Sequence, residues 1–341
     1  MKRGMAWVLL AALAVLLVGC HTSDGGKVHQ RTYIGVFDTV LYVSRYTADG
    51  TSFQNEADRI YEELAEYHRL FDIYNNYDGV NNLKTVNDQA GVAPVEVDGR
   101  LIDLLLDCRE YYEATGGRVN VAMGSMLAIW HNVRSQNINA PDKAFLPDSA
   151  MLEEAAAHCG WDAVVIDKQN KTVFITDPAQ SLDVGAVAKG WAVQKVADGA
   201  AEGLLISLGG NVCATGPKNE AGDGWTIGIQ DPDREGDYLR KVGLTCGSAV
   251  TSGDYQRYFM LDGKRYHHII DPDTRMPAEL WRSVTVLCAD SGVADMLSTA
   301  LFLMDRAQGM ALLEIYNAEA MWLDWAGNCY YSAGFEARLK K

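Results

Sequence analysis

The sequence predicts an α/β protein, a globular chain in which strands and helices alternate, and three observations support this. Its 341 residues suffice for one large domain or two average ones. Apolar residues make up 48% and charged residues 22%, as in folded proteins. Segments with the period of strands alternate with segments of helical period. The formal net charge of -15 also argues against a general nucleic-acid binder, which needs a cationic surface.

Residues 1–19 have the features of a bacterial export signal. Lys2 and Arg3 precede an uncharged apolar run, residues 6–18, which is too short to span a membrane comfortably. The run ends in Leu-Val-Gly-Cys20, which is similar to a lipobox, whose cysteine is lipidated after cleavage. The sequence thus predicts an exported lipoprotein, held by Cys20 on the extracytoplasmic face of the cell membrane. A secretory signal in which Cys20 is incidental is the alternative.

Residues 20–30 are predicted to form a flexible tether, and residues 31–335 a single domain. Six cysteines follow Cys20, scattered and without a CxxC pair. They indicate neither a disulfide framework nor a zinc site, so mostly buried thiols are expected.

The first half of the domain is predicted to begin with a strand and to continue mainly as helices. Phe53, Ala57, Ile60 and Leu64 recur at helical spacing and predict a helix over residues 53–74. The other elements expected in this half are a strand at 31–44, helices at 100–114 and 148–158, and a hairpin at 163–177.

Strands are more frequent in the predicted second half. Asp262 and Gly263 form a tight-turn pair that predicts a hairpin of residues 258–261 with 265–270. Asp290 or Ser291 can cap a helix over 292–304. The other expected elements are helices at 188–201 and 307–316, strands at 203–208, 225–230, 239–245 and 283–289, and a hairpin at 321–331.

The turn at residues 181–190 is the first of four candidate sites. Its small residues leave backbone N–H groups free to meet an anion at the start of a helix. Asp183 could accept a hydrogen bond from a ligand, and Lys189 could reach a phosphate. An ordinary strand-to-helix turn with a surface lysine has the same pattern.

The second candidate is residues 205–212, where an apolar strand runs into Gly209-Gly210-Asn211. Glycine permits positive φ angles and close approach. The segment is therefore either a structural turn or an edge against a planar ring.

The third candidate spans residues 248–254 and 265–272, with Arg257 between them. His267 and His268 are adjacent on a predicted strand, so they should point to opposite faces. One imidazole would face a pocket beside Arg257 and Arg265, where it could act as a general base. A purely structural histidine pair is the alternative.

The fourth candidate is the pair Asp295 and Thr299 on the helix predicted at 292–304. Their i,i+4 spacing places a carboxylate and a hydroxyl on one face of the helix. Two hard oxygens suit Mg²⁺, which takes few protein ligands and keeps several waters. A polar stripe on an apolar helix is the alternative.

Together these segments resemble the ApbE family of FAD:protein FMN transferases. The motifs occur in one order between residues 33 and 333: Asp-x-Gly-Ala-x-Ala-Lys-Gly, Leu-Gly-Gly-Asn, Thr-Ser-Gly-Asp-Tyr-x-Arg-Tyr, His-His-Ile-Ile-Asp-Pro and Ala-Asp-x-Leu-Ser-Thr-Ala-Leu-Phe. The resemblance implies an α+β protein with a T-fold-like core and mixed, largely antiparallel sheets packed by helices. It also implies Mg²⁺-dependent transfer of FMN from FAD to a Thr or Ser hydroxyl of acceptor subunits of membrane redox complexes, with release of AMP.

The resemblance also implies roles for individual residues. The metal ligands would be the Ala186 carbonyl, the Asp295 carboxylate and the Thr299 hydroxyl, and His268 would be catalytic. The residues implied in FAD binding are Phe37, Tyr74, Arg118, Val119, Asn120, Asp183, Lys189 and Ile269. Asn120 stands where the family often has an acid, and Arg275 replaces a glycine.

Two other functions fit the same residues. An FAD pyrophosphatase would use water in place of the acceptor hydroxyl and release FMN and AMP. A lipid-anchored flavin-binding protein would need no catalytic histidine or metal pair, and such proteins usually show two similar lobes, whereas no internal repeat is visible here.

Overall fold

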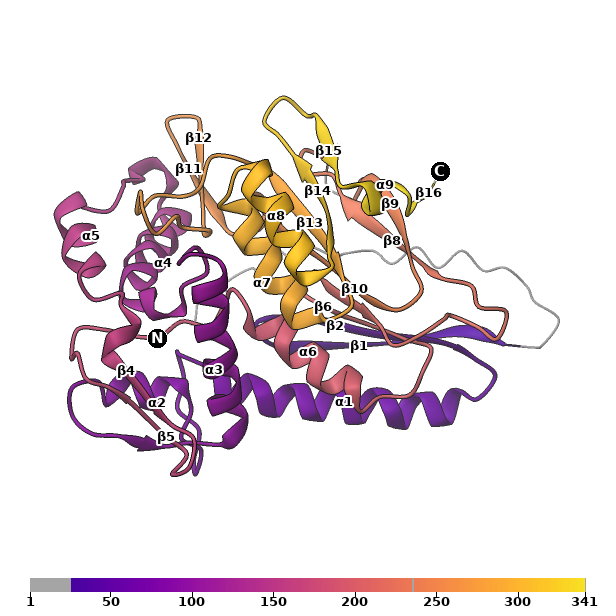
Figure 1. Ribbon diagram of the computed structural model, residues 1–341, viewed down its shortest axis with the longest axis horizontal. Coiled ribbons are helices and arrows are strands. Elements are labelled where there is room, and N and C mark those ends of the chain that lie inside the picture. Colours follow the sequence, from indigo (N-terminus) through magenta and orange to yellow (C-terminus); the bar gives the residue numbers. More distant parts are fainter. Residues whose placement is uncertain (1–25, 235, 341) are drawn as a thin grey trace.

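The computed structural model describes residues 26–234 and 236–340, so the predicted signal peptide and Cys20 lie outside the described residues. An eight-stranded sheet with helices on one face forms the main body, and a smaller helical part lies at its side (Figure 1). In spatial order its strands are β1 (Lys27–Val36), β2 (Thr39–Thr47), β6 (Leu204–Leu208), β7 (Asn211–Ala214), β10 (Gly247–Gly253), β13 (Ser283–Cys288), β14 (Glu319–Leu323) and β15 (Cys329–Tyr331). Every neighbouring pair is antiparallel, which confirms the predicted mixed α and β architecture with antiparallel sheets.

Alternating residues of the large sheet enter two different cores. Leu204, Ile206 and Val286 belong to the main core, while Leu205 and Leu287 face the opposite side. The main core is covered chiefly by α1 (Gly50–Phe71), α6 (Ala188–Asp198), α7 (Ser291–Phe302) and α8 (Arg306–Tyr316). A small sheet of β8 (Trp225–Gln230), β9 (Tyr238–Leu244) and β16 (Leu339–Lys340), with α9 (Ala333–Glu336), packs on the other face.

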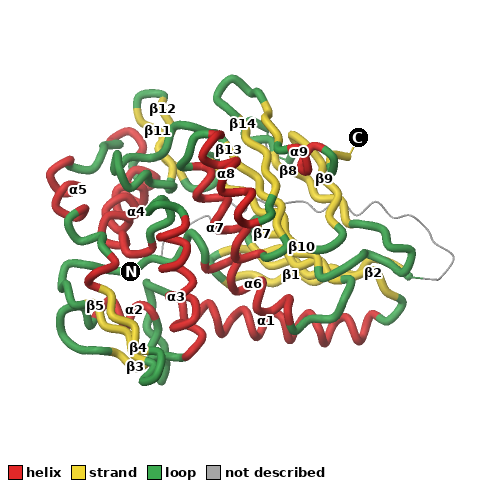
Figure 2. The backbone as a smooth tube through the Cα atoms, in the orientation of Figure 1, coloured by secondary structure: helices red, strands yellow, loops and turns green. Residues whose placement is uncertain are grey.

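The smaller part is built from residues between β2 and β6 in the chain. Figure 2 shows its helices and short strands grouped beside the sheet. It contains α2 (Leu83–Asp88), α3 (Gly99–Ala114), α4 (Gly124–Asn139) and α5 (Ser149–Ala156), with a sheet of β3 (Val95–Glu96), β5 (Thr172–Ile175) and β4 (Val164–Asp167). No described helix is long and apolar enough to cross a membrane.

The structure corrects the predicted start of the domain. Residues 27–30, predicted as tether, belong to β1, because their backbone pairs with residues 44–47 of β2. The single strand predicted at 31–44 is a hairpin of β1 and β2. Its turn is formed by Phe37 and Asp38, both with positive φ, a conformation that glycine, asparagine and aspartate favour and that is unusual for phenylalanine.

The helix predicted over 53–74 is α1, which begins and ends three residues earlier. Asp49 caps it by accepting hydrogen bonds from the N–H groups of Thr51 and Ser52. After Phe71 the Asp72 carboxylate accepts from the N–H of Tyr74 at 2.6 Å, which draws the chain into a loop. Tyr74 therefore lies in that loop and not on the helix.

The predicted hairpin around Asp262 and Gly263 is confirmed as β11 (Tyr258–Leu261) and β12 (Lys264–His267). Both turn residues have positive φ, as this two-residue turn requires. The second strand is shorter than predicted and ends at His267, so His268 lies just beyond it. Of the six described cysteines, all are free but only Cys108 and Cys213 are buried, so the expectation of mostly buried thiols was wrong.

Candidate active site

The N-terminal end of α6 lies directly against α7. A Cβ atom at Gly190 would overlap the Ser291 carbonyl oxygen and the Asp295 Cβ, so only glycine permits this contact without movement. The Gly190 N–H donates a hydrogen bond to Asp295 Oδ2 at 2.8 Å. The fold thereby brings the predicted motif at residues 181–190 to the Asp295 helix.

The Asp295 carboxylate is 4% exposed and is surrounded by donors. Besides Gly190, the Asn211 side-chain amide donates to Asp295 Oδ2 at 3.0 Å, and Lys189 Nζ lies 3.7 Å from the same oxygen. A buried charge is tolerated where it is paired in this way. We call the group of Ala186, Lys189, Asn211, Asp295 and Thr299 the carboxylate corner.

The two other residues expected to bind the metal are carried by α7 and by the segment before α6, the two helices that meet at Gly190. Thr299 follows Asp295 by one helical turn on α7 and is half-buried, and Ala186 precedes α6 by two residues. Ser252 of β10 and Ser298 of α7 share a hydrogen bond of 2.8 Å, which ties the Thr-Ser-Gly-Asp motif to the same helix.

The donor set of this corner fits a hard cation. It offers one carboxylate, one hydroxyl and main-chain oxygen, which suits Mg²⁺ with retained waters better than a transition metal. Within residues 26–234 and 236–340 there is no cluster of three His, Cys, Asp or Glu side chains that would indicate a zinc-type site. Asn211 Oδ1 is buried and accepts no hydrogen bond from the described residues.

The two adjacent histidines have different surroundings. His267 is buried, with Nε2 2.8 Å from the Ala278 carbonyl oxygen, and its Nδ1 accepts from the Ile269 N–H at 3.2 Å. Its ring packs edge-on against Phe302. Both nitrogens are thus engaged within the core, and His267 is structural.

His268 faces a group of cations. Its Nδ1 is buried without a hydrogen-bond partner among the described residues. Burial holds the pKa of His268 well below its ordinary value, and the positive charges of Arg257, Arg134 and Lys189 lower this pKa further. The imidazole is therefore neutral at pH 7 and free to accept a proton.

Three more groups, Tyr74, His131 and Asp183, lie near the cations around His268. Arg134 Nη2 lies 3.0 Å from His131 Nδ1, and the Tyr74 hydroxyl lies 3.4 Å from the same nitrogen. Burial raises the pKa of Asp183, while the nearby Arg257, His131 and Arg134 oppose that rise. We call the group of Tyr74, His131, Arg134, Asp183, Arg257 and His268 the histidine pocket.

Lys189 connects the two groups. Its ammonium is near Asp295 and is also one of the cations that lower the pKa of His268. The carboxylate corner and the histidine pocket are therefore parts of one site, although their residues come from segments far apart in the sequence.

Phe37 and Tyr74 are joined by a chain of hydrogen bonds behind the pocket. The Phe37 N–H donates to His68 Nδ1 at 3.2 Å, and the other nitrogen of this ring lies 3.5 Å from the Tyr77 hydroxyl. Tyr77 donates to Asp72 at 2.7 Å, and Asp72 holds the Tyr74 backbone. Through this chain the β1–β2 turn and the Tyr74 loop support each other.

The remaining residues predicted to bind FAD have other contacts. Arg118 forms ion pairs with Asp273 at 2.6 Å and Asp271 at 3.5 Å, directly after the two histidines. Val119 and Ile269 are buried in the main core. Asn120 uses both halves of its amide, accepting from the Ala122 N–H and donating to the Cys159 carbonyl. The structure therefore does not bring the side chains of Val119 and Asn120 into the histidine pocket.

A buried ion pair anchors the hairpin that carries the histidines. Asp254 is fully buried, with Arg265 of β12 at 2.9 Å and Arg282 at 3.5 Å. Arg282 also pairs with Asp233 at 2.7 Å. Asp254 therefore ties β10, β11–β12 and the start of β13 together and fixes the position of His268.

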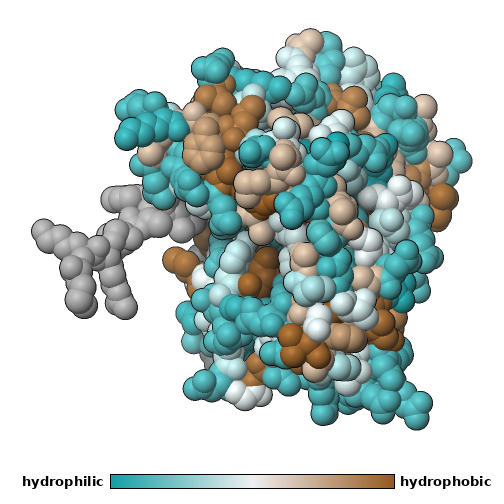
Figure 3. Space-filling model, turned by 90° about the vertical axis from the view of Figure 1, so that its left-hand side faces the viewer, coloured by the Kyte–Doolittle hydropathy of each residue, from teal (hydrophilic) through white to brown (hydrophobic). Residues whose placement is uncertain are grey.

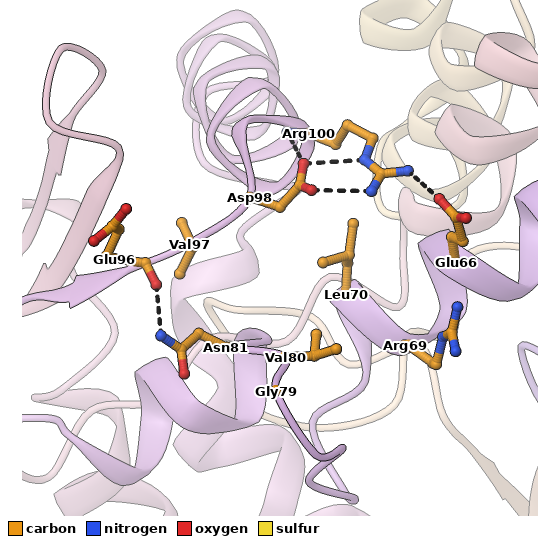
Figure 4. Close-up of a pocket in the computed structure, with 10 residues that line it drawn as sticks. All are labelled: Glu66, Arg69, Leu70, Gly79, Val80, Asn81, Glu96, Val97, Asp98 and Arg100. Atoms are coloured by element: carbon orange, nitrogen blue, oxygen red, sulfur yellow. Dashed lines mark hydrogen bonds and ion pairs between the residues drawn. The ribbon is translucent and has the colours of Figure 1, made fainter.

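A separate cleft of about 500 Å³ lies between α1, the segment at residues 79–81 and the start of α3. Figure 4 shows Arg100 in its wall, held by Asp98 and Glu66. No residue of the carboxylate corner or the histidine pocket lines it.

The face that carries the smaller part shows hydrophobic side chains interspersed among hydrophilic ones (Figure 3).

Three residues of this site were not assigned from the sequence. His131 and Arg134 lie on α4, a helix that was not predicted, and Asn211 was noted only as part of a glycine turn. The i,i+3 spacing of His131 and Arg134 is a signal only once the helix is known. The contact of Asn211 with Asp295 spans 84 residues and has no local signature.

The sequence matches the ApbE family over residues 37–322. A curated relative from Treponema pallidum (strain Nichols), named FAD:protein FMN transferase, is 32% identical over all of this chain and 97% of its own length. A relative of the same name from Klebsiella pneumoniae (strain 342) is 30% identical over 75% of this chain and 78% of its own.

Solved structures agree with this assignment. The ApbE protein of Thermotoga maritima superposes with a TM-score of 0.81 at 27% identity, covering 92% of this chain and all of the other. The flavin transferase ApbE of Vibrio cholerae, at 24% identity, shares the fold with a TM-score of 0.73 over 92% of this chain and all of its own. The chain therefore belongs to the ApbE family.

Proposed function

We propose that this protein is an FAD:protein FMN transferase, which moves FMN from FAD to a Thr or Ser hydroxyl of an acceptor protein and releases AMP. One observation carries the proposal: a neutral imidazole at His268, whose buried Nδ1 has no partner among the described residues, and a buried carboxylate at Asp295 belong to one cation-lined site, joined by Lys189. The names of the relatives support the same activity.

The reaction joins the FMN phosphorus to the acceptor oxygen and breaks its bond to the bridging oxygen, so that AMP leaves. His268 would take the proton of the attacking hydroxyl, because its depressed pKa keeps Nδ1 or Nε2 available as a base at pH 7. Arg118 and the buried Asp254 pair hold the histidine hairpin in place.

The pyrophosphate of FAD is anionic and the chain carries a net charge of -15, so the site must offset repulsion locally. Arg134, Arg257 and Lys189 supply positive charge around His268. Asp295, Thr299 and the Ala186 carbonyl would hold Mg²⁺, which when bound neutralises phosphoryl oxygens. Phe37, Tyr74 and Asp183 would line the flavin, with Ile269 and the segment of Arg118, Val119 and Asn120 behind it.

The acceptor would be a subunit of a membrane redox complex, reached by an enzyme exported and anchored through Cys20. These two points come from the sequence and from family resemblance, and a test is lipid analysis of the mature protein. Palmitate on Cys20 supports the anchoring, whereas a mature chain lacking Cys20 contradicts it.

The activity is tested by incubating the protein with FAD, Mg²⁺ and a candidate acceptor, followed by in-gel flavin fluorescence and intact mass. We expect a fluorescent acceptor carrying one FMN, and AMP in equal amount. FMN and AMP without an adduct, for any acceptor tried, would indicate the pyrophosphatase instead. Bound FAD with no AMP would indicate a flavin-binding protein and contradict both enzyme activities.

A further inference from the structure

In the carboxylate corner, the packing of the fold does not explain the hydrogen bonding of the buried Asn211 amide. It lies at the first position of β7, where the large sheet meets α6 and α7. Its side chain is 1% exposed. A buried amide is usually fully hydrogen-bonded, because each unpaired group has lost water without compensation.

One half of this amide is committed to Asp295. The amide nitrogen donates to Asp295 Oδ2 at 3.0 Å, beside the Gly190 N–H at 2.8 Å. The orientation follows from chemistry, since an ionised carboxylate only accepts and the nitrogen must face it. These donors engage Oδ2, whereas Oδ1 receives no hydrogen bond from residues 26–234 and 236–340.

The other half of the amide is unused. Asn211 Oδ1 is buried and accepts no hydrogen bond within the part of the chain that the structure describes. It is one carbon away from the nitrogen that contacts Asp295, so the unused acceptor lies at the edge of the same corner. Mg²⁺ usually keeps several waters, and such a water donates hydrogen bonds and needs an acceptor.

We propose that Asn211 is a positioning residue for the divalent cation of this site. Its amide nitrogen orients the Asp295 carboxylate, and its amide oxygen accepts from a water bound to the cation. The inference rests on the proposed function, because it assumes the metal ligands proposed there. Groups that orient metal ligands typically change metal affinity about 10- to 100-fold when they are removed.

The test uses Asn211→Leu, which keeps the approximate side-chain size and removes both amide atoms. Binding of Mn²⁺ to metal-free protein is followed by electron paramagnetic resonance with saturating ADP, whose pyrophosphate can complete the coordination without donating FMN. We expect the Kd for Mn²⁺ to rise about 10- to 100-fold. A folded Asn211→Leu protein with the wild-type Kd would overturn the inference.

The matched control is Asn137→Leu on α4. Asn137 is likewise a buried amide, 2% exposed, and it makes two hydrogen bonds, both to the backbone of Phe145. Its loss should lower Tm while leaving the Kd for Mn²⁺ within about twofold of wild type. An equal rise in Kd in both variants would make the effect of Asn211 purely structural and would overturn the inference.

If Asn211→Leu fails to fold, Asn211→Ser replaces it, because a serine hydroxyl is too short to reach Asp295. The same rise in Kd is expected, and a wild-type Kd overturns the proposal. Wild-type protein that binds no Mn²⁺ with ADP would overturn the metal site itself, and this inference with it. If the wild type binds Mn²⁺ but transfers no FMN, the proposed function fails while the role of Asn211 stands.

Discussion

The carboxylate corner and the histidine pocket lie side by side but are built in opposite ways. Asp295 accepts hydrogen bonds from donors on α6 and β7. The close contact of α6 with α7 at Gly190 holds these elements in place. The pocket instead collects groups whose charges repel or whose polar atoms are not hydrogen-bonded: within the described part of the chain the His268 Nδ1 has no partner, and Arg134 and Arg257 both lie near its ring. Tyr74 is 52% exposed.

This difference suits the carboxylate corner and the histidine pocket to two different tasks. A metal ligand must keep its geometry, and the close packing of α6, α7 and β7 supplies rigidity. A general base needs a free nitrogen, and an anion-binding site needs cations that are not already paired with carboxylates. The histidine pocket keeps such groups unpaired, which lowers the stability of the fold. Substitutions in the corner should therefore remove metal and activity together, whereas substitutions in the pocket should change rate or pH dependence with the metal retained.

The largest effect is expected from Asp295→Ala. It removes the charged ligand of the proposed metal site, so FMN transfer should fall below detection, as measured by in-gel fluorescence of the acceptor. Asp290→Ala is the matched control, since it removes another carboxylate at the same helix, one that only caps the Val293 N–H. Wild-type rates in Asp295→Ala at low millimolar Mg²⁺ would refute the assignment.

His268→Ala should have the next largest effect. Loss of a general base lowers the rate by about 10²- to 10⁴-fold, while FAD and Mn²⁺ should still bind. Single-turnover transfer and FAD titration measure the two separately. His267→Ala is the neighbouring control, expected to lower Tm through its contacts in the core. Equal loss of FAD binding and rate in His268→Ala would make His268 a binding residue.

Gly190→Ala tests whether close packing makes the corner rigid. The added methyl overlaps the Ser291 carbonyl and the Asp295 Cβ, so the free energy of unfolding should fall by about 1–3 kcal/mol. Urea unfolding measures it, and Mn²⁺ affinity should drop in parallel. Gly99→Ala, at a position with open space around it, should change stability little. Equal stabilities of both variants would show that the contact is not tight.

The smallest effect is a shift of the pH profile in Arg257→Gln. His268 is active when neutral, so its depressed pKa extends activity below pH 6.5, and the rate falls only as pH drops through that pKa. Removing the Arg257 charge raises the pKa of His268, and the acidic limb of kcat should move to higher pH. Arg240→Gln, on β9 beside Tyr331, should leave the limb in place. A shift to lower pH contradicts the proposed electrostatics.

The sequence predicts most of the elements that frame the site, because local signals define them. Helical spacing from Phe53 indicated α1, and the pair Asp262 and Gly263 indicated the β11–β12 turn. The β1–β2 turn was missed because Phe37, which adopts positive φ beside Asp38, is not a usual turn residue. Tertiary packing, and not local propensity, stabilises that conformation.

From the sequence, only the site residues that lie within recognisable motifs could be predicted. Asp295, Thr299 and Lys189 follow from spacing and resemblance, and the structure places Lys189 beside Asp295. The roles of His131 and Asn211 depend on contacts with distant segments, and that of Arg134 depends on a helix that was not predicted, so a single sequence does not reveal them. Val119 and Asn120 illustrate another limit, since motif position predicts flavin contact while the fold shows a core side chain at Val119 and backbone partners for the Asn120 amide, so their contact with flavin stays a prediction.

The most direct test of this account is a crystal structure of the protein with Mn²⁺ and ADP, in which anomalous scattering locates the metal. We expect one peak bonded to the Asp295 carboxylate, the Thr299 hydroxyl and the Ala186 carbonyl, with a metal-bound water donating to Asn211 Oδ1 and His268 facing the pyrophosphate. A peak elsewhere, or a pyrophosphate bound far from both Asp295 and His268, would contradict the account.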